Sequence, residues 1–72
     1  MTINKGKYRH YKGKEYEVLG TALHSETLEE MVVYRTLYKN EKSELWIRPS
    51  KMFIEKIEVG GKEIPRFTPI SN

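Results

Sequence analysis

The sequence predicts an all-β protein, a small barrel of five to six short antiparallel strands with one 3-10 or α-helical turn near residues 49–53. Apolar and polar residues alternate over short stretches, which is the pattern of strands with one buried face. Glycine, proline and short polar runs separate these stretches, as tight turns require. A sheet this small protects its edges best by curling into a barrel.

The first strand is expected over residues 7–11, where Tyr8 and His10 share one face. Lys12 and Gly13 follow as a tight turn, because glycine adopts positive φ without steric cost. The chain then returns antiparallel to this strand.

The second strand is expected over residues 15–24, and its alternation changes phase partway along. Tyr16 and Val18 alternate with glutamates, but the later apolar residues fall on the other parity. These later residues are Leu19 and Leu23. Gly20 lies at the change of phase, so we expect a bulge or bend there that returns both sets to one core.

Residues 25–30 are mostly polar, and we interpret them as the connection of a hairpin. Thr27 and Glu30 match a capping box, but the strongly β-prone segment 31–38 follows at once. Both faces of 31–38 carry apolar side chains, which predicts a central strand. The next strand is expected over residues 44–48.

Pro49 ends that strand, because a proline has no N–H to donate to a neighbouring strand. Residues 49–53 suit one helical turn, since proline is favoured in a first turn. Met52 and Phe53 are expected to plug the end of the sheet from this turn.

The last expected element is a hairpin of residues 55–59 and 62–67 around a Gly60–Gly61 turn. The order of elements, with a bent second strand and a late helical turn, resembles that of SH3-like barrels. That resemblance concerns the fold and carries no function.

The length of 72 residues predicts one small β-barrel domain over 1–72, with 1–6 and 68–72 expected to be flexible. The chain has no cysteine, which suits a reducing compartment. The start of the chain lacks an apolar core, and the longest apolar run, 31–34, is far below the roughly 18 residues of a membrane helix. We therefore expect a cytoplasmic protein that has no signal peptide and does not insert into a membrane.

Basic side chains gather at the start of the chain. Five of them precede the first acid and the whole chain carries +3, so the remaining residues carry a net −2. The five are Lys5, Lys7, Arg9, Lys12 and Lys14. Such a basic edge or arm is suited to nucleic acid. The alternative is a lysine-rich edge strand that prevents sheets from pairing.

Four segments of the sequence resemble an uncharacterised bacterial family, domain of unknown function 1653. They read HSET, VVYR, W-x-RP-x-x-MF and PRF, and the resemblance extends over residues 6–67. It implies a short, stand-alone bacterial cytoplasmic domain. It brings no established activity, substrate or catalytic residue.

Chemically active side chains are concentrated in the expected loop 24–29. They are His24, Ser25, Glu26, Thr27 and Glu29. A histidine beside a serine and carboxylates is the composition of nucleophilic or acid–base catalysis. Adjacent strand residues point to opposite faces and no G-x-S-x-G motif is present, so we lean against an enzyme and assign no catalytic residue. The alternative is a loop whose side chains bond its own backbone.

A metal site is not expected from the ligands available. The chain has two histidines and no cysteine, whereas zinc takes three or four nitrogen or sulfur ligands. We predict no metal and no cofactor.

Arg35 and Arg48 lie in apolar strands, where a charge needs a partner or the protein surface. A bidentate pair with a carboxylate would be structural, whereas a free arginine near His24 indicates an anionic ligand. The carboxylates available for such a pair are Glu17, Glu26 and Glu29.

Aromatic side chains are numerous for so small a domain. They include Tyr8, Tyr11, Tyr16, Tyr34, Tyr38 and Trp46. With basic neighbours they can stack bases and hold phosphates, although no RNP, KH or helix-turn-helix signature is present. Exposed tyrosine, tryptophan and arginine are also the usual anchors of protein-binding patches. Packing in the core is the third interpretation.

We therefore predict a non-enzymatic binding module with an anionic partner, either nucleic acid or a phosphorylated small molecule. The alternative is a protein–protein adaptor that uses an exposed Tyr/Trp surface. The predicted ligand-binding residues are His24, Glu26, Thr27, Arg35, Trp46 and Arg48. The predicted nucleic-acid contacts are Lys5, Lys7, Arg9, Lys12 and Lys14.

Overall fold

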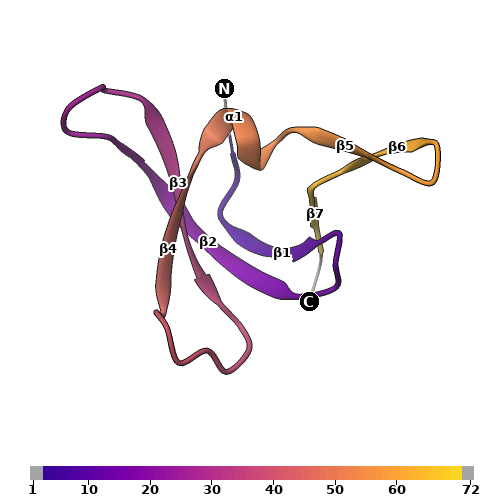
Figure 1. The fold of residues 1–72 in the computed structure, drawn as a ribbon. Helices are drawn as coiled ribbons and strands as arrows, with labels where there is room; N and C mark the ends of the chain where they lie inside the picture. Colours follow the sequence, from indigo (N-terminus) through magenta and orange to yellow (C-terminus); the bar gives the residue numbers. More distant parts are fainter. Residues whose placement is uncertain (1–2, 71–72) are drawn as a thin grey trace.

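A computed structural model describes residues 3–70, and in this range the chain forms seven strands and one short helix (Figure 1). In chain order these are β1 (Gly6–His10), β2 (Glu15–Leu23), β3 (Glu30–Thr36), β4 (Leu45–Pro49), α1 (Ser50–Phe53), β5 (Lys56–Val59), β6 (Lys62–Pro65) and β7 (Phe67–Pro69). Five strands make one antiparallel sheet in the order β4-β3-β2-β1-β7, while β5 and β6 pair only with each other. The all-β prediction is confirmed.

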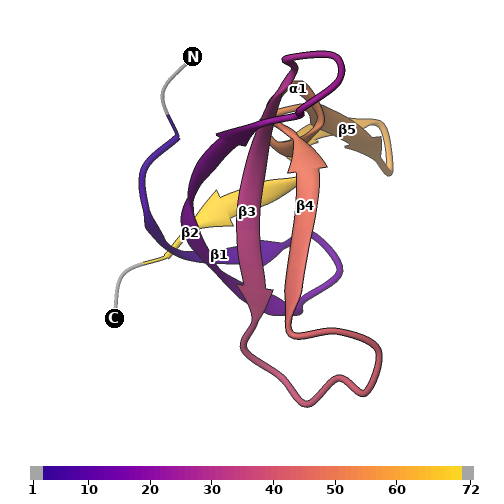
Figure 2. The ribbon, with the colours of Figure 1, turned by 90° about the vertical axis from the view of Figure 1, so that its left-hand side faces the viewer.

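The barrel prediction is not confirmed, because the five-stranded sheet remains open. Within residues 3–70, no strand pairs with the outer side of β4 or of β7. The sheet nevertheless curls strongly, so that β7 lies behind β2 and β3 when the sheet is viewed from outside (Figure 2). Phe67 of β7 thereby contacts Tyr34 of β3 across the concave side, with ring centroids 5.9 Å apart.

The predicted bulge in β2 is confirmed. The register of β2 against β3 shifts between Val18 and Gly20, and Gly20 has φ of +156°. The expectation that the bulge returns Leu19 and Leu23 to the core is wrong, since both side chains are exposed. Both lie on β2 beyond Val18, the last residue of β2 that pairs with β1, and the buried side chains of this part of the hairpin, Met31 and Val32, belong to β3.

The core lies on the concave side of the sheet. Its buried members are Tyr8, Val18, Val32, Tyr34, Phe53 and Phe67. The predicted helical turn is present as α1, preceded by Pro49, and Phe53 is only 2% exposed. Met52 was also expected to plug the sheet, but it is 42% exposed, because a single turn presents only one side to the core.

The convex side carries charged residues matched across neighbouring strands. The register places Lys7, Glu17, Arg35 and Leu45 in one row over β1, β2, β3 and β4. The strand β1 lies between β2 and β7, so the lysine-rich start of the chain is not an edge of the sheet as the sequence suggested. Lys7 and Arg9 of β1 therefore project from a face of the sheet.

The β5–β6 hairpin projects away from the sheet (Figure 1). Gly60 and Gly61 form its turn with φ of +58° and +81°, the conformation that a two-residue hairpin turn requires and that glycine adopts without strain. The predicted Gly-Gly hairpin is confirmed, but its second strand ends at Pro65 instead of Phe67, because the chain bends at Arg66 and Phe67 begins β7. Among the described residues, no helix is long and apolar enough to cross a membrane.

Candidate functional site

A series of aromatic rings on the concave side joins a lysine at one end to an arginine at the other. The Lys14 ammonium lies 4.7 Å from the centre of the Tyr38 ring, and Tyr38 packs edge-on against Tyr16 at 5.6 Å. Tyr16 in turn contacts Tyr34 at 5.3 Å, and the Arg48 Nε lies 3.5 Å from the Tyr34 hydroxyl. The β1–β2 turn and the β3–β4 loop are therefore joined by ring contacts.

The β3–β4 loop forms an open depression of about 490 Å³ next to these rings. Its lining residues are Tyr38, Lys39, Asn40, Glu41, Lys42 and Trp46. The Trp46 indole N–H donates a hydrogen bond of 3.1 Å to the Ser43 carbonyl, which fixes the plane of the ring. Two half-buried aromatic rings thus share a hollow with two exposed lysines.

We define the basic aromatic surface as Lys14, Tyr38, Lys39, Lys42, Trp46 and Arg48. Trp46 and Arg48 alternate with outward-facing Leu45 and Ile47 on β4, so both point to the concave side. The Arg48 guanidinium also lies 5.5 Å from the centre of the Phe67 ring. None of the ion pairs within residues 3–70 involves these four cations, so their charges face solvent or aromatic rings.

Tyr16 and Tyr38 share a hydrogen bond between their hydroxyl groups, 3.1 Å long. Burial raises the pKa of Tyr16 far above its usual value of 10, and this bond raises it further. Tyr16 is therefore a neutral hydrogen-bonding group that holds Tyr38 in place, and it does not act as a base.

His10 borders the same cluster from β1. Its Nδ1 accepts a hydrogen bond of 3.2 Å from the backbone N–H of Lys12, and its ring contacts Phe67 edge-on at 4.9 Å. Burial lowers the pKa of His10 below its usual 6.5, and the positive charges of Arg48, Arg66 and Lys12 lower it further. The imidazole is thus neutral at physiological pH.

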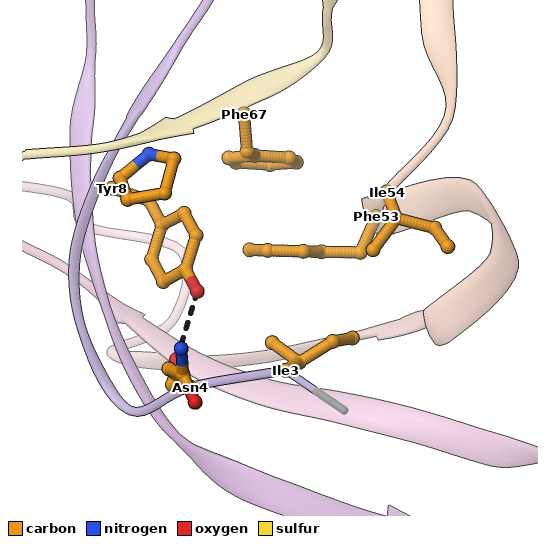
Figure 3. A pocket seen from close by; sticks show the side chains of 7 residues that line it. Ile3, Asn4, Tyr8, Phe53, Ile54 and Phe67 are labelled. Carbon is orange, nitrogen blue, oxygen red and sulfur yellow. Dashed lines mark hydrogen bonds between the residues drawn. The ribbon is translucent and has the colours of Figure 1, made fainter. Parts of the chain in front are cut away.

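A second hollow lies on the other side of the core, between the N-terminal segment and α1 (Figure 3). Its volume is about 290 Å³, and its walls are mainly apolar: Ile3, Asn4, Tyr8, Phe53, Ile54, Phe67 and Pro69. The Tyr8 hydroxyl points into this region and already donates a hydrogen bond of 2.9 Å to the Asn4 carbonyl. With its hydroxyl engaged and no charged side chain in its lining, this hollow offers little to orient a ligand.

The loop 24–29 directs its polar side chains at its own backbone. The Nδ1 of His24 accepts hydrogen bonds from the N–H groups of Glu26 (3.1 Å) and Thr27 (3.3 Å), and the Thr27 hydroxyl accepts one from the Glu29 N–H. Leu28 occupies the left-handed region with φ of +61°. These bonds match the scaffolding alternative that the sequence left open.

The structure does not bring Arg35 to that loop. Its Nε donates to Glu17 Oε1 at 2.8 Å and its Nη2 contacts the same oxygen, so Arg35 is paired on the convex face. Trp46 and Arg48 lie on the concave face, whereas His24, Glu26 and Thr27 lie at the tip of the β2–β3 hairpin. The six predicted ligand-binding residues are therefore divided among three places.

The five predicted nucleic-acid contacts are also divided. Arg9 forms an ion pair of 3.0 Å with Glu15, and Lys7 lies opposite Glu17, so both face acids on the convex side. Lys5 precedes β1, and its side chain passes the backbone of Gly20. Lys12 lies near the Tyr11 ring at 5.8 Å, and only Lys14 belongs to the basic aromatic surface.

Residues 39–43 are polar and connect the expected strands 31–38 and 44–48, and Lys39 and Lys42 are not among the residues that the sequence predicts for a binding site. A signal was available, because this turn carries two lysines and is flanked by Tyr38 and Trp46. One aromatic residue precedes this basic loop and one follows it, and pairing of the flanking strands brings the two together.

Within residues 3–70, no three histidine or carboxylate side chains gather to hold a metal ion.

Comparisons with known proteins agree with this fold. The sequence profile of a family described as "Protein of unknown function (DUF1653)" matches residues 6–69. The chain is also similar to the crystal structure of a DUF1653 protein from Bordetella bronchiseptica, with 37% sequence identity and a TM-score of 0.89. That match covers 94% of this chain and 87% of the other. Among curated proteins, none matches this chain.

Proposed function

The chain belongs to DUF1653, a family of proteins of unknown function, and we propose that it is a non-enzymatic cytoplasmic module that binds single-stranded nucleic acid. The binding site is the basic aromatic surface. The observation that carries this proposal is the open hollow that Tyr38 and Trp46 share with Lys39 and Lys42.

The two rings supply the stacking part of such a site. Proteins that bind single strands place aromatic side chains where successive bases can stack, and each stacked base contributes roughly 1–3 kcal/mol. Tyr38 is held by its bond to Tyr16, and Trp46 by its bond to the Ser43 carbonyl. Rings that are already fixed lose little conformational entropy when a base binds.

The lysines and Arg48 supply the phosphate-binding part. Lys14, Lys39 and Lys42 are exposed, and Arg48 lies at the far end of the ring series. The surface as defined carries four basic side chains, and Glu41 is the one acidic residue in the lining of the hollow, so positive charge is in excess. A groove of this sign attracts a polyanion from solution and releases its condensed cations on binding.

The test is fluorescence anisotropy of a labelled oligothymidine single strand, measured at several salt concentrations. Affinity is expected to fall steeply as salt rises, and the double variant Lys14→Glu/Lys42→Glu is expected to bind more weakly. If both lysines contact phosphates, this variant also lowers the slope of log affinity against log salt by about 1.4. The matched control is Lys56→Glu/Lys62→Glu, which makes the same charge change on the exposed β5–β6 hairpin.

Trp46 provides a site-specific readout because it is the only tryptophan of the chain. Stacking of a base on Trp46 is expected to quench its fluorescence in step with the anisotropy change. Absence of binding at low salt would reject the proposal. Binding that weakens equally in both double variants, or that leaves Trp46 unquenched, would place the nucleic acid elsewhere. The amide chemical shifts of loop 24–29, which is the other candidate surface, would then be measured.

A further inference from the structure

The strand β4 is an edge of the sheet, and its apolar side chains are uncovered. Among the described residues nothing pairs with its outer side, and Leu45 and Ile47 are 54% and 60% exposed on the convex face. Edge strands that remain free in solution are normally protected by charges, bulges or prolines along their length. Here Pro49 stands only at the end, and the centre of the edge reads Leu-Trp-Ile.

The outward hydrogen-bonding groups of this edge can be identified from the ladder with β3. The Thr36 N–H donates a hydrogen bond to the Glu44 carbonyl, so the backbone groups of Glu44 point towards β3. Along an antiparallel strand the backbone groups of successive residues point alternately towards a neighbouring strand and away from it, so those of Trp46, which lies opposite Tyr34, also point towards β3. The backbone groups of Leu45 and Ile47 therefore point away from the sheet. The Ser43 hydroxyl donates to the Leu45 carbonyl from that side, which leaves the second lone pair of this oxygen available.

The sequence of the edge is complementary to itself when read antiparallel. Residues 44–48 are Glu-Leu-Trp-Ile-Arg. If Trp46 lies opposite Trp46 of a second copy, Leu45 lies opposite Ile47, and Glu44 lies opposite Arg48. Each charge then meets its opposite and each aliphatic side chain meets another, which are the favourable cross-strand pairs of antiparallel sheets.

This register also satisfies the backbone. The backbone groups of Leu45 and Ile47 both point away from the sheet at this edge. Each residue can therefore donate an N–H bond to the opposing residue of the second copy and accept one at its carbonyl. Trp46 points its backbone inward and forms the close, non-hydrogen-bonded pair on the two-fold axis. If the two strands were shifted by one residue, a residue whose backbone groups point outward would lie opposite one whose backbone groups point inward, and these hydrogen bonds would be lost.

We propose that two copies of this chain associate through β4, with Trp46 on the two-fold axis and Glu44 of each copy paired with Arg48 of the other. The interface is isologous and joins two five-stranded sheets into one. It is one strand wide, at the small end of specific interfaces, so the dimer forms at high protein concentration. It also places the basic aromatic surfaces of the two copies side by side along one continuous sheet.

Sedimentation velocity of the ligand-free chain, from about 10 μM to about 1 mM, tests the proposal in the range of a weak complex. The wild type is expected to shift from monomer to dimer. Glu44→Arg and Arg48→Glu each oppose like charges in both pairs, and each is expected to weaken the dimer about tenfold. Glu44 is exposed and takes part in no ion pair of residues 3–70, so Glu44→Arg leaves the fold intact.

The decisive sample is an equimolar mixture of the two variants. One copy then carries two arginines and the other two glutamates at positions 44 and 48, so the heterodimer regains both pairs. Recovery of dimer in the mixture supports the register. The control is Glu58→Arg on the β5–β6 hairpin, which is expected to dimerise like the wild type.

Three results would overturn the proposal: a wild type that stays monomeric throughout, single variants that dimerise unchanged, or a mixture that stays monomeric when melting shows both variants folded. Each result is obtained without nucleic acid. The outcome is therefore independent of whether the proposed function holds.

Discussion

The rings of Phe53 and Phe67 are stacked almost parallel, with centroids 4.1 Å apart and planes 7° apart (Figure 3). This contact joins α1 to β7, the last strand of the sheet, and Tyr8 meets Phe53 edge-on at 5.2 Å. The curled shape of the sheet is thus maintained by a few aromatic contacts across its concave side, since the described strands do not close the sheet by hydrogen bonds.

Phe53→Ala is expected to lower the free energy of unfolding by about 3–5 kcal/mol, because it removes a buried ring from the middle of this cluster. Urea denaturation measures the change. The control is Met52→Ala on the same turn, which is expected to change stability by about 0.5 kcal/mol or less because the side chain is exposed. Similar losses in the two variants would contradict the assigned core.

Gly20→Val is expected to destabilise the protein by roughly 1–3 kcal/mol, because valine strains a backbone with φ of +156°. No atom crowds the position, since the nearest is the Lys5 Cε at 3.8 Å, so the loss comes from the backbone alone. Gly20→Ala should then lower the free energy of unfolding by part of the same amount. A denaturation midpoint unchanged in both variants would mean that the bulge tolerates side chains.

Ser50→Ala is expected to leave stability unchanged or to raise it slightly. The Ser50 hydroxyl is buried and has no hydrogen-bond partner within the described residues. Its removal therefore breaks no hydrogen bond, and it removes the desolvation cost of burying an unpaired polar group. Ser43→Ala is the contrasting variant, because its hydroxyl donates to the Leu45 carbonyl at 2.7 Å. Thermal melting should show that Ser43→Ala loses about 0.5–1.5 kcal/mol and Ser50→Ala does not.

Acid is expected to destabilise the protein through His10. Because its pKa is lowered on folding, the unfolded chain binds a proton more readily, and stability falls as the pH drops below about 6.5 towards the lowered value. His10→Gln removes this contribution. The difference in urea midpoint between pH 7 and pH 5 should therefore be smaller in His10→Gln than in the wild type, and an equal or larger difference would contradict the prediction.

Local pattern was enough to predict the elements that depend on neighbouring residues. Gly20 marked the change of phase in β2, Gly60 and Gly61 marked a hairpin, and Pro49 marked the start of α1. Barrel closure could not be predicted in this way. The apolar alternation of β4 is the same whether Leu45 faces a core or solvent, and β7 is too short to show any period.

The contacts around the candidate site could not be predicted in the same way, because they depend on strand register. Glu17 was one of three carboxylates within possible reach of Arg35, and only the pairing of β2 with β3 places it directly opposite. Likewise, Lys14 and Tyr38 lie far apart in the sequence and meet because the β1–β2 turn and the β3–β4 loop fall at the same end of the sheet. The spacing of these residues along the chain predicts neither contact.

The projecting β5–β6 hairpin makes this chain convenient to label. Its strands pair only with each other, and Lys62 beside the Gly60–Gly61 turn is exposed. Because the sequence contains no cysteine, Lys62→Cys would accept a thiol-reactive dye at one defined position. A dye there lies outside both the basic aromatic surface and the β4 edge, so the same preparation reports ligand uptake and self-association without occupying either surface.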